Sequence, residues 1–538
     1  MLDYLIRNAQ ILDGSGAPAV SGDVGISGGT IAAVGDLGDV PAHQIIDAAG
    51  RTLTPGFLDI HRHADDALFR PGFGPAELSQ GLTTVVNGNC GLSLAPVDGP
   101  HRASVLQYLS PIVGAQDARD FPTLAAYRRQ ACAAGTALHV GTLVGMGTLR
   151  ACVAGFRDGP LTDEEYRQLH ALLERALGDG ALGVSLGLGY APECFYDTPG
   201  LIRALEPLRD SGVPVTVHMR QEGDGVVEAL TEMLTVARNL RTPVEISHLK
   251  AIGRRNWRRA VPRMLKMLSQ ARQEGLDIAC DVYPYPAGST QLIHVLPPEF
   301  QAGGMEALTA ALRDPGKRAA MRARMETGTD FENISLLVGF ENILPTSLHA
   351  PGDRPYEGKS LADIAAQVDR DPYDVLFDLL AREHCAASMI DRITDQADID
   401  DILRTPFSSV ISDATYPVGG LLHPRVYGTF PRVLESYVRE RHVLTLSEAV
   451  HKMTRLPADR LGLVQKGRIQ PGADADLCLF DPAAIHERDT WQNPEQTAAG
   501  MDYVFVSGVP AIEEGQYTGE RKKSAVNVQL SPPQRLFA

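Results

Sequence analysis

The sequence is poor in cysteine and has no close cysteine pair. Its 538 residues include seven cysteines, an odd number without any C-x-x-C spacing: Cys90, Cys132, Cys152, Cys194, Cys280, Cys385 and Cys478. Such scattered cysteines argue against a disulfide framework, which small secreted domains build from closely spaced pairs. We therefore expect a protein of a reducing compartment.

Long hydrophobic runs and an excess of basic residues are also missing. No apolar stretch approaches the ~20 residues that span a bilayer, and the first residues carry Asp3 and no apolar region typical of a signal peptide. The formal net charge is −16, whereas binding to a phosphate backbone requires a basic face. We expect a soluble, cytoplasmic protein that binds neither nucleic acid nor a membrane.

The two ends of the chain have the same pattern of short apolar segments. Short apolar runs separated by Gly, Asp and Ser fill residues 2–54, and similar runs return only between residues 467 and 508. Because neither piece is long enough to bury a core alone, we expect both to form one small β-sandwich from residues 1–55 and 462–525. Residues 526–538 would be a C-terminal tail.

The middle of the chain, residues 56–461, alternates strands with helices. Thr162 and Glu165 form a capping box that predicts a helix over residues 162–178, and an apolar run follows at once. The same alternation indicates eight parallel strands, at residues 56–60, 82–86, 138–144, 181–188, 213–217, 244–247, 277–282 and 410–412. This pattern favours an α/β fold of the (β/α)₈ TIM-barrel type. The long segment before the last strand predicts an inserted subdomain at about residues 290–350.

Residues that can bind metal follow five of these strands. In such a barrel the active site lies at the carboxyl ends of the strands. The residues there are His61, His63, Cys90, His218, His248 and Asp413. Each alone is a weak signal, since a single buried His or Cys is more often structural. Their common position on one face of the barrel is the stronger argument for a metal site.

Four segments carry a resemblance to a known family. Residues 54–63 (TPGFLDIHRH) resemble the opening signature of the amidohydrolase superfamily. Residues 88–91 (GNCG), 247–250 (SHLK) and 423–434 (HPRVYGTFPRVL) are similar to the N-acyl-D-amino-acid deacylases, or D-aminoacylases. The resemblance extends from the first strands to about residue 510, which is nearly the whole chain.

The resemblance implies a zinc site. Cys90 matches the cysteine that the deacylases use where other superfamily members have a bridging, carboxylated lysine, and with His218 and His248 it would hold one tightly bound Zn²⁺. His61 and His63 match the ligands of a second, weaker metal position. Zinc lowers the pKa of its bound water to roughly 7. Asp413 matches the general base that takes a proton from this water and passes it to the leaving amine.

The resemblance also implies how a substrate is held. Lys250 and Arg425 match the cations that clamp the α-carboxylate of the substrate, with Tyr283 as their hydroxyl partner. Tyr190 resembles a residue near the scissile carbonyl. The chain departs from the family at Met146, where the deacylases usually have a His, and at Ala414, where they usually have a Gly. Both departures bear on the acyl or side-chain specificity and leave the metal ligands intact.

The function expected from this resemblance is zinc-dependent hydrolysis of N-acyl-D-amino acids to a carboxylate and a free D-amino acid. Two alternatives stay open. One is an amidohydrolase of the hydantoinase or dihydroorotase type, acting on a cyclic amide, although no lysine lies between strands three and four to bridge two metals. The other is an inactive barrel that serves as a binding protein. The sequence does not determine the oligomeric state, and a homo-oligomer is one of the open alternatives.

Overall fold

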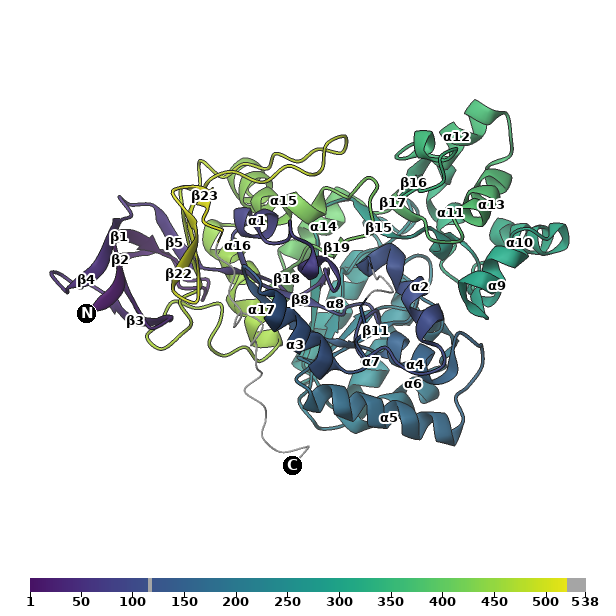
Figure 1. The fold of residues 1–538 in the computed structure, drawn as a ribbon, viewed down its shortest axis with the longest axis horizontal. Helices are drawn as coiled ribbons and strands as arrows, with labels where there is room; N and C mark the ends of the chain where they lie inside the picture. The colour runs from purple at the N-terminus through teal and green to yellow at the C-terminus, as the bar shows by residue number, and fades with distance from the viewer. Residues whose placement is uncertain (115–118, 520–538) are drawn as a thin grey trace.

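The computed structural model describes residues 1–114 and 119–519. Short, fully buried strands alternate with helices through the middle of the chain (Figure 1). They lie at or next to all eight predicted positions: β6 (Phe57–Asp59), β7 (Arg62–His63), β8 (Leu82–Asn87), β9 (His139–Thr142), β10 (Val144–Gly145), β11 (Val184–Gly187), β12 (Val215–His218), β13 (Val244–Ile246), β14 (Ile278–Val282), β18 (Ser408–Val410) and β19 (Ala414–Thr415).

All pairings between these strands are parallel. β6 pairs with β8 and β8 with β9, while β10, β11, β12, β13, β14 and β18 pair in that order. β10 follows β9 after a single residue. β19 pairs with β7, and the Asp413 amide donates to the His61 carbonyl at 2.9 Å. The order of pairing is consistent with the predicted barrel.

Helices connect the parallel strands: α1 (Pro75–Ser79), α2 (Arg102–Val113), α3 (Leu124–Ala134), α4 (Met146–Ala154), α5 (Asp163–Gly178), α6 (Thr198–Ala204), α7 (Val226–Leu240), α8 (Ala260–Gln273) and α14 (Gln396–Leu403). α5 confirms the predicted capping box, because Thr162 and Glu165 satisfy each other's backbone amides at its start. Its apolar face, with Leu169 and Leu173, is buried against the body of the protein.

Both ends of the chain contribute to one nine-stranded sheet. The N-terminal strands are β1 (Leu2–Ile11), β2 (Val20–Ser27), β3 (Thr30–Gly35), β4 (Ala42–Asp47) and β5 (Thr52–Pro55). The C-terminal strands are β20 (Leu477–Phe480), β21 (Met501–Val506), β22 (Val509–Glu513) and β23 (Gln516–Tyr517). β5 and β20 pair antiparallel with Leu53 opposite Leu479, and they join the two halves. The predicted tail at 526–538 lies outside the described residues.

Part of the segment between β14 and β18 lies at the far end of the molecule from the β1–β4 strands (Figure 1). This part includes the helices α9 (Gly304–Ala311), α10 (Pro315–Thr327), α11 (Ile334–Val338), α12 (Leu361–Val368) and α13 (Pro372–Arg382). The segment also contains an antiparallel sheet of β15 (Ala287–Gln291), β17 (Ser388–Arg392) and β16 (Ile343–Thr346). We call residues 287–392 the insertion.

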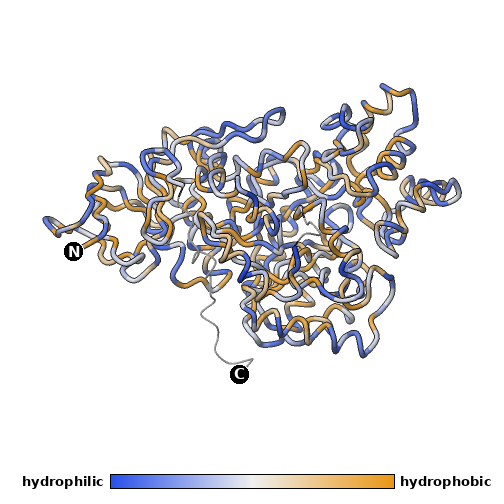
Figure 2. Tube along the Cα trace, in the orientation of Figure 1, coloured by the Kyte–Doolittle hydropathy of each residue, from blue (hydrophilic) through white to orange (hydrophobic). Residues whose placement is uncertain are grey.

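The chain returns from the last parallel strand through a helical segment to the terminal sheet. This segment comprises α15 (Arg425–Arg432), the π-helix η8 (Val433–Glu440), α16 (Leu446–Met453) and α17 (Arg455–Arg460). The loop from 481 to 500 that follows β20 is largely hydrophilic (Figure 2), and Trp491 from this loop packs edge-on against His423. Among the helices of the described residues, none is long and apolar enough to cross a membrane.

Candidate active site

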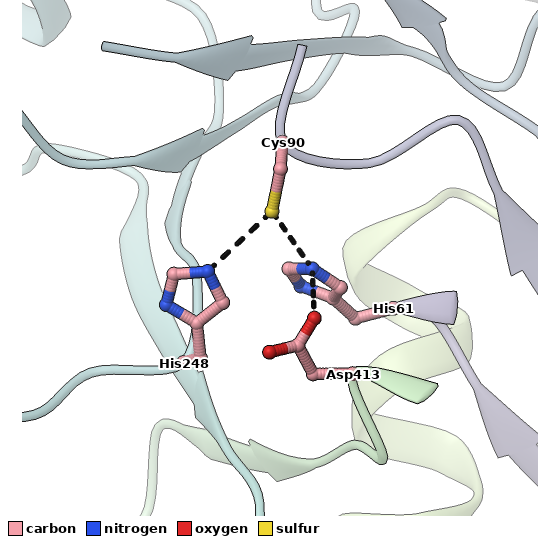
Figure 3. Close-up of side chains that lie close together, drawn as sticks. All are labelled: His61, Cys90, His248 and Asp413. Atoms are coloured by element: carbon pink, nitrogen blue, oxygen red, sulfur yellow. Dashed lines mark hydrogen bonds and ion pairs between the residues drawn. The ribbon is translucent and has the colours of Figure 1, made fainter. Parts of the chain in front are cut away.

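Four of the predicted residues converge at one point where the parallel strands end (Figure 3). Cys90 Sγ lies 3.2 Å from His61 Nε2 and 3.4 Å from His248 Nε2. Asp413 Oδ1 lies 3.4 Å from His61 Nε2. One ligand atom from each of the four residues falls within 4.8 Å of the others, and all four side chains are buried.

The other two predicted ligands contact this cluster. His218 Nδ1 lies 3.1 Å from His248 Nε2, the same nitrogen that faces Cys90. His63 Nε2 lies 3.3 Å from Asp413 Oδ1. His218 and His248 also form a second group of potential ligands with Glu222. The structure therefore brings all six predicted residues together, although their chain positions span more than 350 residues.

The backbone at three of these residues has an unusual conformation. Cys90, His248 and Asp413 have positive φ angles of 53°, 37° and 52°. A non-glycine residue rarely adopts this left-handed region, and such residues cluster at functional sites. Each lies just after a parallel strand, where the chain turns away from the direction of the strand. The chain thus accepts local strain at three of the converging residues.

The arrangement fits a metal ion of borderline softness. Thiolate, imidazole and carboxylate are the side chains that bind zinc, at about 2.0–2.3 Å, so that neighbouring ligand atoms stand roughly 3.3–3.7 Å apart. The separations of 3.1–3.4 Å around His248 Nε2 and Cys90 Sγ lie at the lower end of that spacing or slightly below it. Without an ion, four polar groups would share a buried point with few hydrogen bonds, which is costly.

Burial controls the ionisation of the potential ligands. It lowers the pKa of His61 to about 3 and holds that of His218 well below its usual value. The imidazoles are therefore neutral, as metal ligands must be. Burial also raises the pKa of the Cys90 thiol well above its usual range. A bound cation would have to displace this proton, because the thiolate is the ligand.

Asp413 is held in its ionised form. Burial alone would raise the pKa of its carboxyl group, but the Arg425 guanidinium and the neighbouring His63 and His61 outweigh burial and keep this pKa well below its usual range. Arg425 Nη1 lies 2.9 Å from Asp413 Oδ2, and Arg425 is completely buried. Asp413 therefore presents an acceptor oxygen next to His61 and His63 at neutral pH.

The predicted substrate-binding residues lie around the same cluster. Lys250 Nζ is 2.8 Å from His248 Nδ1 and 5.8 Å from the centre of the Tyr283 ring. The Arg425 guanidinium lies 4.9 Å from that ring centre. The Tyr190 ring packs 4.5 Å from the His218 ring, and its hydroxyl is 2.9 Å from Thr290 Oγ1.

A cavity opens onto the cluster. The predicted residues that line it are His63, Cys90, Tyr190, His218, His248, Lys250, Tyr283 and Asp413. His61 and Arg425 are fully buried and contact the cluster from behind these side chains. Of the two departures noted in the sequence, neither Met146 nor Ala414 is among the described lining residues, whereas Thr415 is.

Several buried acidic residues of the site were missed in the sequence. Glu222 lies four residues beyond His218, and its Oε1 is 3.0 Å from His248 Nδ1. Asp281, inside β14, accepts from the His248 backbone amide and lies 3.7 Å from His61 Nδ1. Carboxylates that orient metal-binding histidines in this way are usual around metal sites. Asp281 could have been identified from the sequence, because a charged residue within a buried strand is unusual.

Comparison with known proteins identifies the family of the chain. A sequence model of the amidohydrolase family matches residues 44–512. The chain belongs to the amidohydrolase family. Among its relatives, D-aminoacylase from Alcaligenes xylosoxydans xylosoxydans is 34% identical and the alignment covers 96% of each chain. N-acyl-D-glutamate deacylase from the same organism is 35% identical over 94% of this chain and 93% of the relative.

A solved structure gives the same relationship in three dimensions. N-acyl-D-glutamate deacylase from Bordetella bronchiseptica, complexed with zinc and a phosphonate inhibitor that mimics the tetrahedral intermediate, is 31% identical. It superimposes with a TM-score of 0.80, and the match covers 100% of both chains. The predicted resemblance of this chain to the N-acyl-D-amino-acid deacylases is therefore confirmed.

Proposed function

We propose that this protein hydrolyses the linear amide bond of N-acyl-D-amino acids and releases a carboxylate and a free D-amino acid. The observation that carries the proposal is the position of Cys90, whose thiol lies between two histidines and lines a cavity that also presents Lys250 and Tyr283. The similarity to enzymes named D-aminoacylase and N-acyl-D-glutamate deacylase supports the substrate class.

Zinc is the metal that these residues suit best. We assign Cys90, His218 and His248 to a tight site, since His248 Nε2 lies within 3.4 Å of a ligand atom of each of the others. His61 and His63, on either side of Asp413 Oδ1, would form a weaker second site. When bound, zinc supplies a Lewis acid for the scissile carbonyl and lowers the pKa of a water molecule toward neutrality.

Asp413 is the proton carrier in this proposal. Its ionised Oδ1 faces the proposed metal ligands, so it can accept a proton from the attacking water. The same carboxyl group can then deliver that proton to the amide nitrogen as the amine leaves. Arg425, on Oδ2, fixes the orientation of the carboxylate and keeps Oδ1 directed at the proposed metal ligands.

Lys250, Tyr283 and Arg425 are assigned to the α-carboxylate of the substrate. The Lys250 ammonium and the Arg425 guanidinium both lie within 6 Å of the Tyr283 ring centre, and Lys250 and Tyr283 line the cavity. Holding the carboxylate there would place the amide bond beside the metal ligands, and fixed geometry of this kind accelerates the reaction. We assign Tyr190 to the scissile carbonyl, because its ring packs against His218.

We also propose that the chain is organised as a barrel, a composite β-sandwich and an inserted subdomain. The order of parallel pairing supports a closed (β/α)₈ barrel over residues 56–461. The shared nine-stranded sheet supports a composite β-sandwich from residues 1–55 and 462–525. The antiparallel sheet from β15 to β17 supports an inserted subdomain that includes the predicted 290–350. A cytoplasmic location and a homo-oligomer stay predictions.

The experiment that tests the function is a substrate panel with parallel metal analysis. Purified protein is assayed with N-acetyl-D- and N-acetyl-L-amino acids and with a hydantoin and dihydroorotate. We expect turnover of D-substrates only, with close to one tightly bound zinc per chain. Turnover of the cyclic amides alone would favour the hydantoinase type of enzyme, and a metal-free protein without turnover would favour a binding protein.

A further inference from the structure

The insertion supplies a polar part of the cavity wall that the proposed reaction does not use. β15 contributes Gly288, Ser289 and Thr290, and β17 contributes Asp391. His294 and Glu332 also line the cavity, with Ile334 and Ile393 as apolar neighbours. In the proposed function the metal ligands, Asp413 and the carboxylate clamp account for the reacting end of a substrate. This wall is therefore available to bind the substrate side chain.

The Asp391 carboxylate has no partner of its own. The residue is only 2% exposed, and within residues 1–114 and 119–519 no donor hydrogen-bonds to its side chain. Burial raises the pKa of Asp391 to about 6, and His294 and Lys250 only partly offset this effect. An unpaired buried carboxylate that lines a cavity is costly, unless a ligand completes it.

The other charged groups of the cavity are already paired. Glu332 Oε1 lies 3.3 Å from His294 Nε2, and its other oxygen accepts the Glu222 backbone amide. Glu222 is paired with Lys250 at 2.7 Å, and Asp413 with Arg425 at 2.9 Å. Within the described part of the chain, Asp391 is thus the lining carboxylate that has neither a cation nor a hydrogen-bond donor.

Gly288 shows how Asp391 lies relative to the proposed clamp. A Cβ atom at Gly288 would lie 3.0 Å from Asp391 Oδ1, 3.2 Å from the Tyr283 hydroxyl and 2.9 Å from Ile393 Cδ1. Asp391 therefore lies close to the Tyr283 hydroxyl, with the apolar Ile393 side chain beside it. This arrangement suits a substrate side chain with a methylene stem and a cationic end, because the stem can pack on Ile393 while the charge meets Asp391.

We propose that Asp391 determines side-chain specificity and that the preferred substrates are N-acyl derivatives of basic D-amino acids, such as D-lysine, D-ornithine and D-arginine. The inference rests on the proposed function, since it assigns the side-chain subsite of the same reaction. A cationic side chain would form the ion pair that the Asp391 carboxylate lacks. An acidic side chain would face Asp391 and Glu332 and be rejected by like-charge repulsion.

The test compares kcat/KM of the zinc-loaded protein for four substrates. They are N-acetyl-D-lysine, its Nε-acetylated derivative (which keeps the stem and loses the charge), N-acetyl-D-norleucine and N-acetyl-D-glutamate. We expect N-acetyl-D-lysine to exceed each of the others by at least about tenfold, as a charge-assisted hydrogen bond in a buried site implies. Because this comparison uses the unaltered protein, it does not depend on the folding of a variant.

A pair of variants then tests the residue. Asp391→Asn should reduce the preference for N-acetyl-D-lysine over N-acetyl-D-norleucine by about tenfold or more and leave kcat/KM for norleucine within about threefold. Asp374→Asn, on α13 of the same insertion and partly exposed, should leave the preference unchanged. A preference for glutamate or norleucine in the unaltered protein, or an equal loss for both substrates in Asp391→Asn, would overturn the inference alone. Absence of turnover with every N-acyl-D-amino acid would overturn the proposed function as well.

Discussion

Lys250 Nζ lies 2.7 Å from both carboxylate oxygens of Glu222, and both side chains are buried. Burial alone would lower the pKa of Lys250 and raise that of Glu222. Their mutual attraction outweighs burial, so that the pKa of Lys250 is raised and that of Glu222 is lowered. The cation assigned to the substrate carboxylate is thus fixed in place, and its partner also contacts His248 Nδ1.

Glu222→Gln should therefore weaken both the fold and the metal site. Breaking a buried ion pair by removing one partner leaves the other charge uncompensated, at a cost of about 3–5 kcal/mol in the free energy of unfolding. Loss of the carboxylate on a ligating histidine typically costs about 10–100-fold in metal affinity. Denaturant unfolding and zinc titration measure the two effects. Asp224→Asn, in the partly exposed pair with Arg255, is the control and should change stability by less than about 1 kcal/mol.

The sequence could predict the residues that stand at strand ends, because strand period and the barrel rule place them on one face. His61, Cys90, His218, His248 and Asp413 were all found in this way. Glu222 could not be predicted from that rule, since it lies in the loop beyond β12 and the path of that loop back to His248 depends on tertiary packing.

The wall formed by the insertion shows a second limit of sequence reasoning. Asp391 and Gly288 meet because β15 and β17 pair antiparallel with Gly288 opposite Asp391, while about a hundred residues separate them in the chain. Nothing local in either segment encodes that pairing. The strands of the insertion have only four or five residues each, so that their alternation gives little signal.

A paired substitution separates metal binding from proton transfer. Cys90→Ala should remove the tight zinc and, with it, turnover, because the thiolate is the one soft ligand of the cluster. Asp413→Asn should keep the zinc and lower kcat by about 10²–10⁴-fold, the usual contribution of a general base. Metal content by elemental analysis and initial rates distinguish them. Cys280→Ala, at another fully buried cysteine in β14, should retain zinc and activity. Full zinc and full activity in Cys90→Ala would show that the metal assignment is wrong.

Arg425 should determine the pH below which activity is lost, because it lowers the pKa of Asp413. Its guanidinium, 2.9 Å from Asp413 Oδ2, is the main influence that lowers the pKa of this carboxyl group against the effect of burial. Asp413 must be ionised to accept a proton, so a higher pKa means that activity is lost at a higher pH. In Arg425→Gln the acidic limb of the kcat profile should move upward by one pH unit or more.

The conservative variant separates the two roles assigned to Arg425. Arg425→Lys keeps the positive charge and should leave the acidic limb near its original pH, while the loss of bidentate geometry raises KM. Rates are measured across pH on protein of constant zinc content. An unchanged limb in Arg425→Gln would mean that Asp413 is not the titrating base.

Glu193 should make the stability of the fold depend on pH. It lies on the chain just after the Tyr190 turn, is almost completely buried, and accepts the Gly187 amide at 2.7 Å. Burial raises the pKa of Glu193 from 4.5 to about 8, although Arg150 and Arg220 oppose the effect. Between these values the folded state keeps a proton that the unfolded chain releases. Stability must therefore fall as pH rises from about 4.5 to about 8, by up to about 5 kcal/mol.

Glu193→Gln removes this titration and keeps an acceptor oxygen for the Gly187 amide. Its free energy of unfolding, relative to the unaltered protein, should therefore increase steadily over that pH range, as measured by denaturant unfolding at several pH values. Glu164→Gln, at an exposed position on α5, should show the same pH dependence as the unaltered protein. Parallel curves for Glu193→Gln and the unaltered protein would mean that Glu193 is ionised in the folded state, and that Arg150 and Arg220 outweigh its burial.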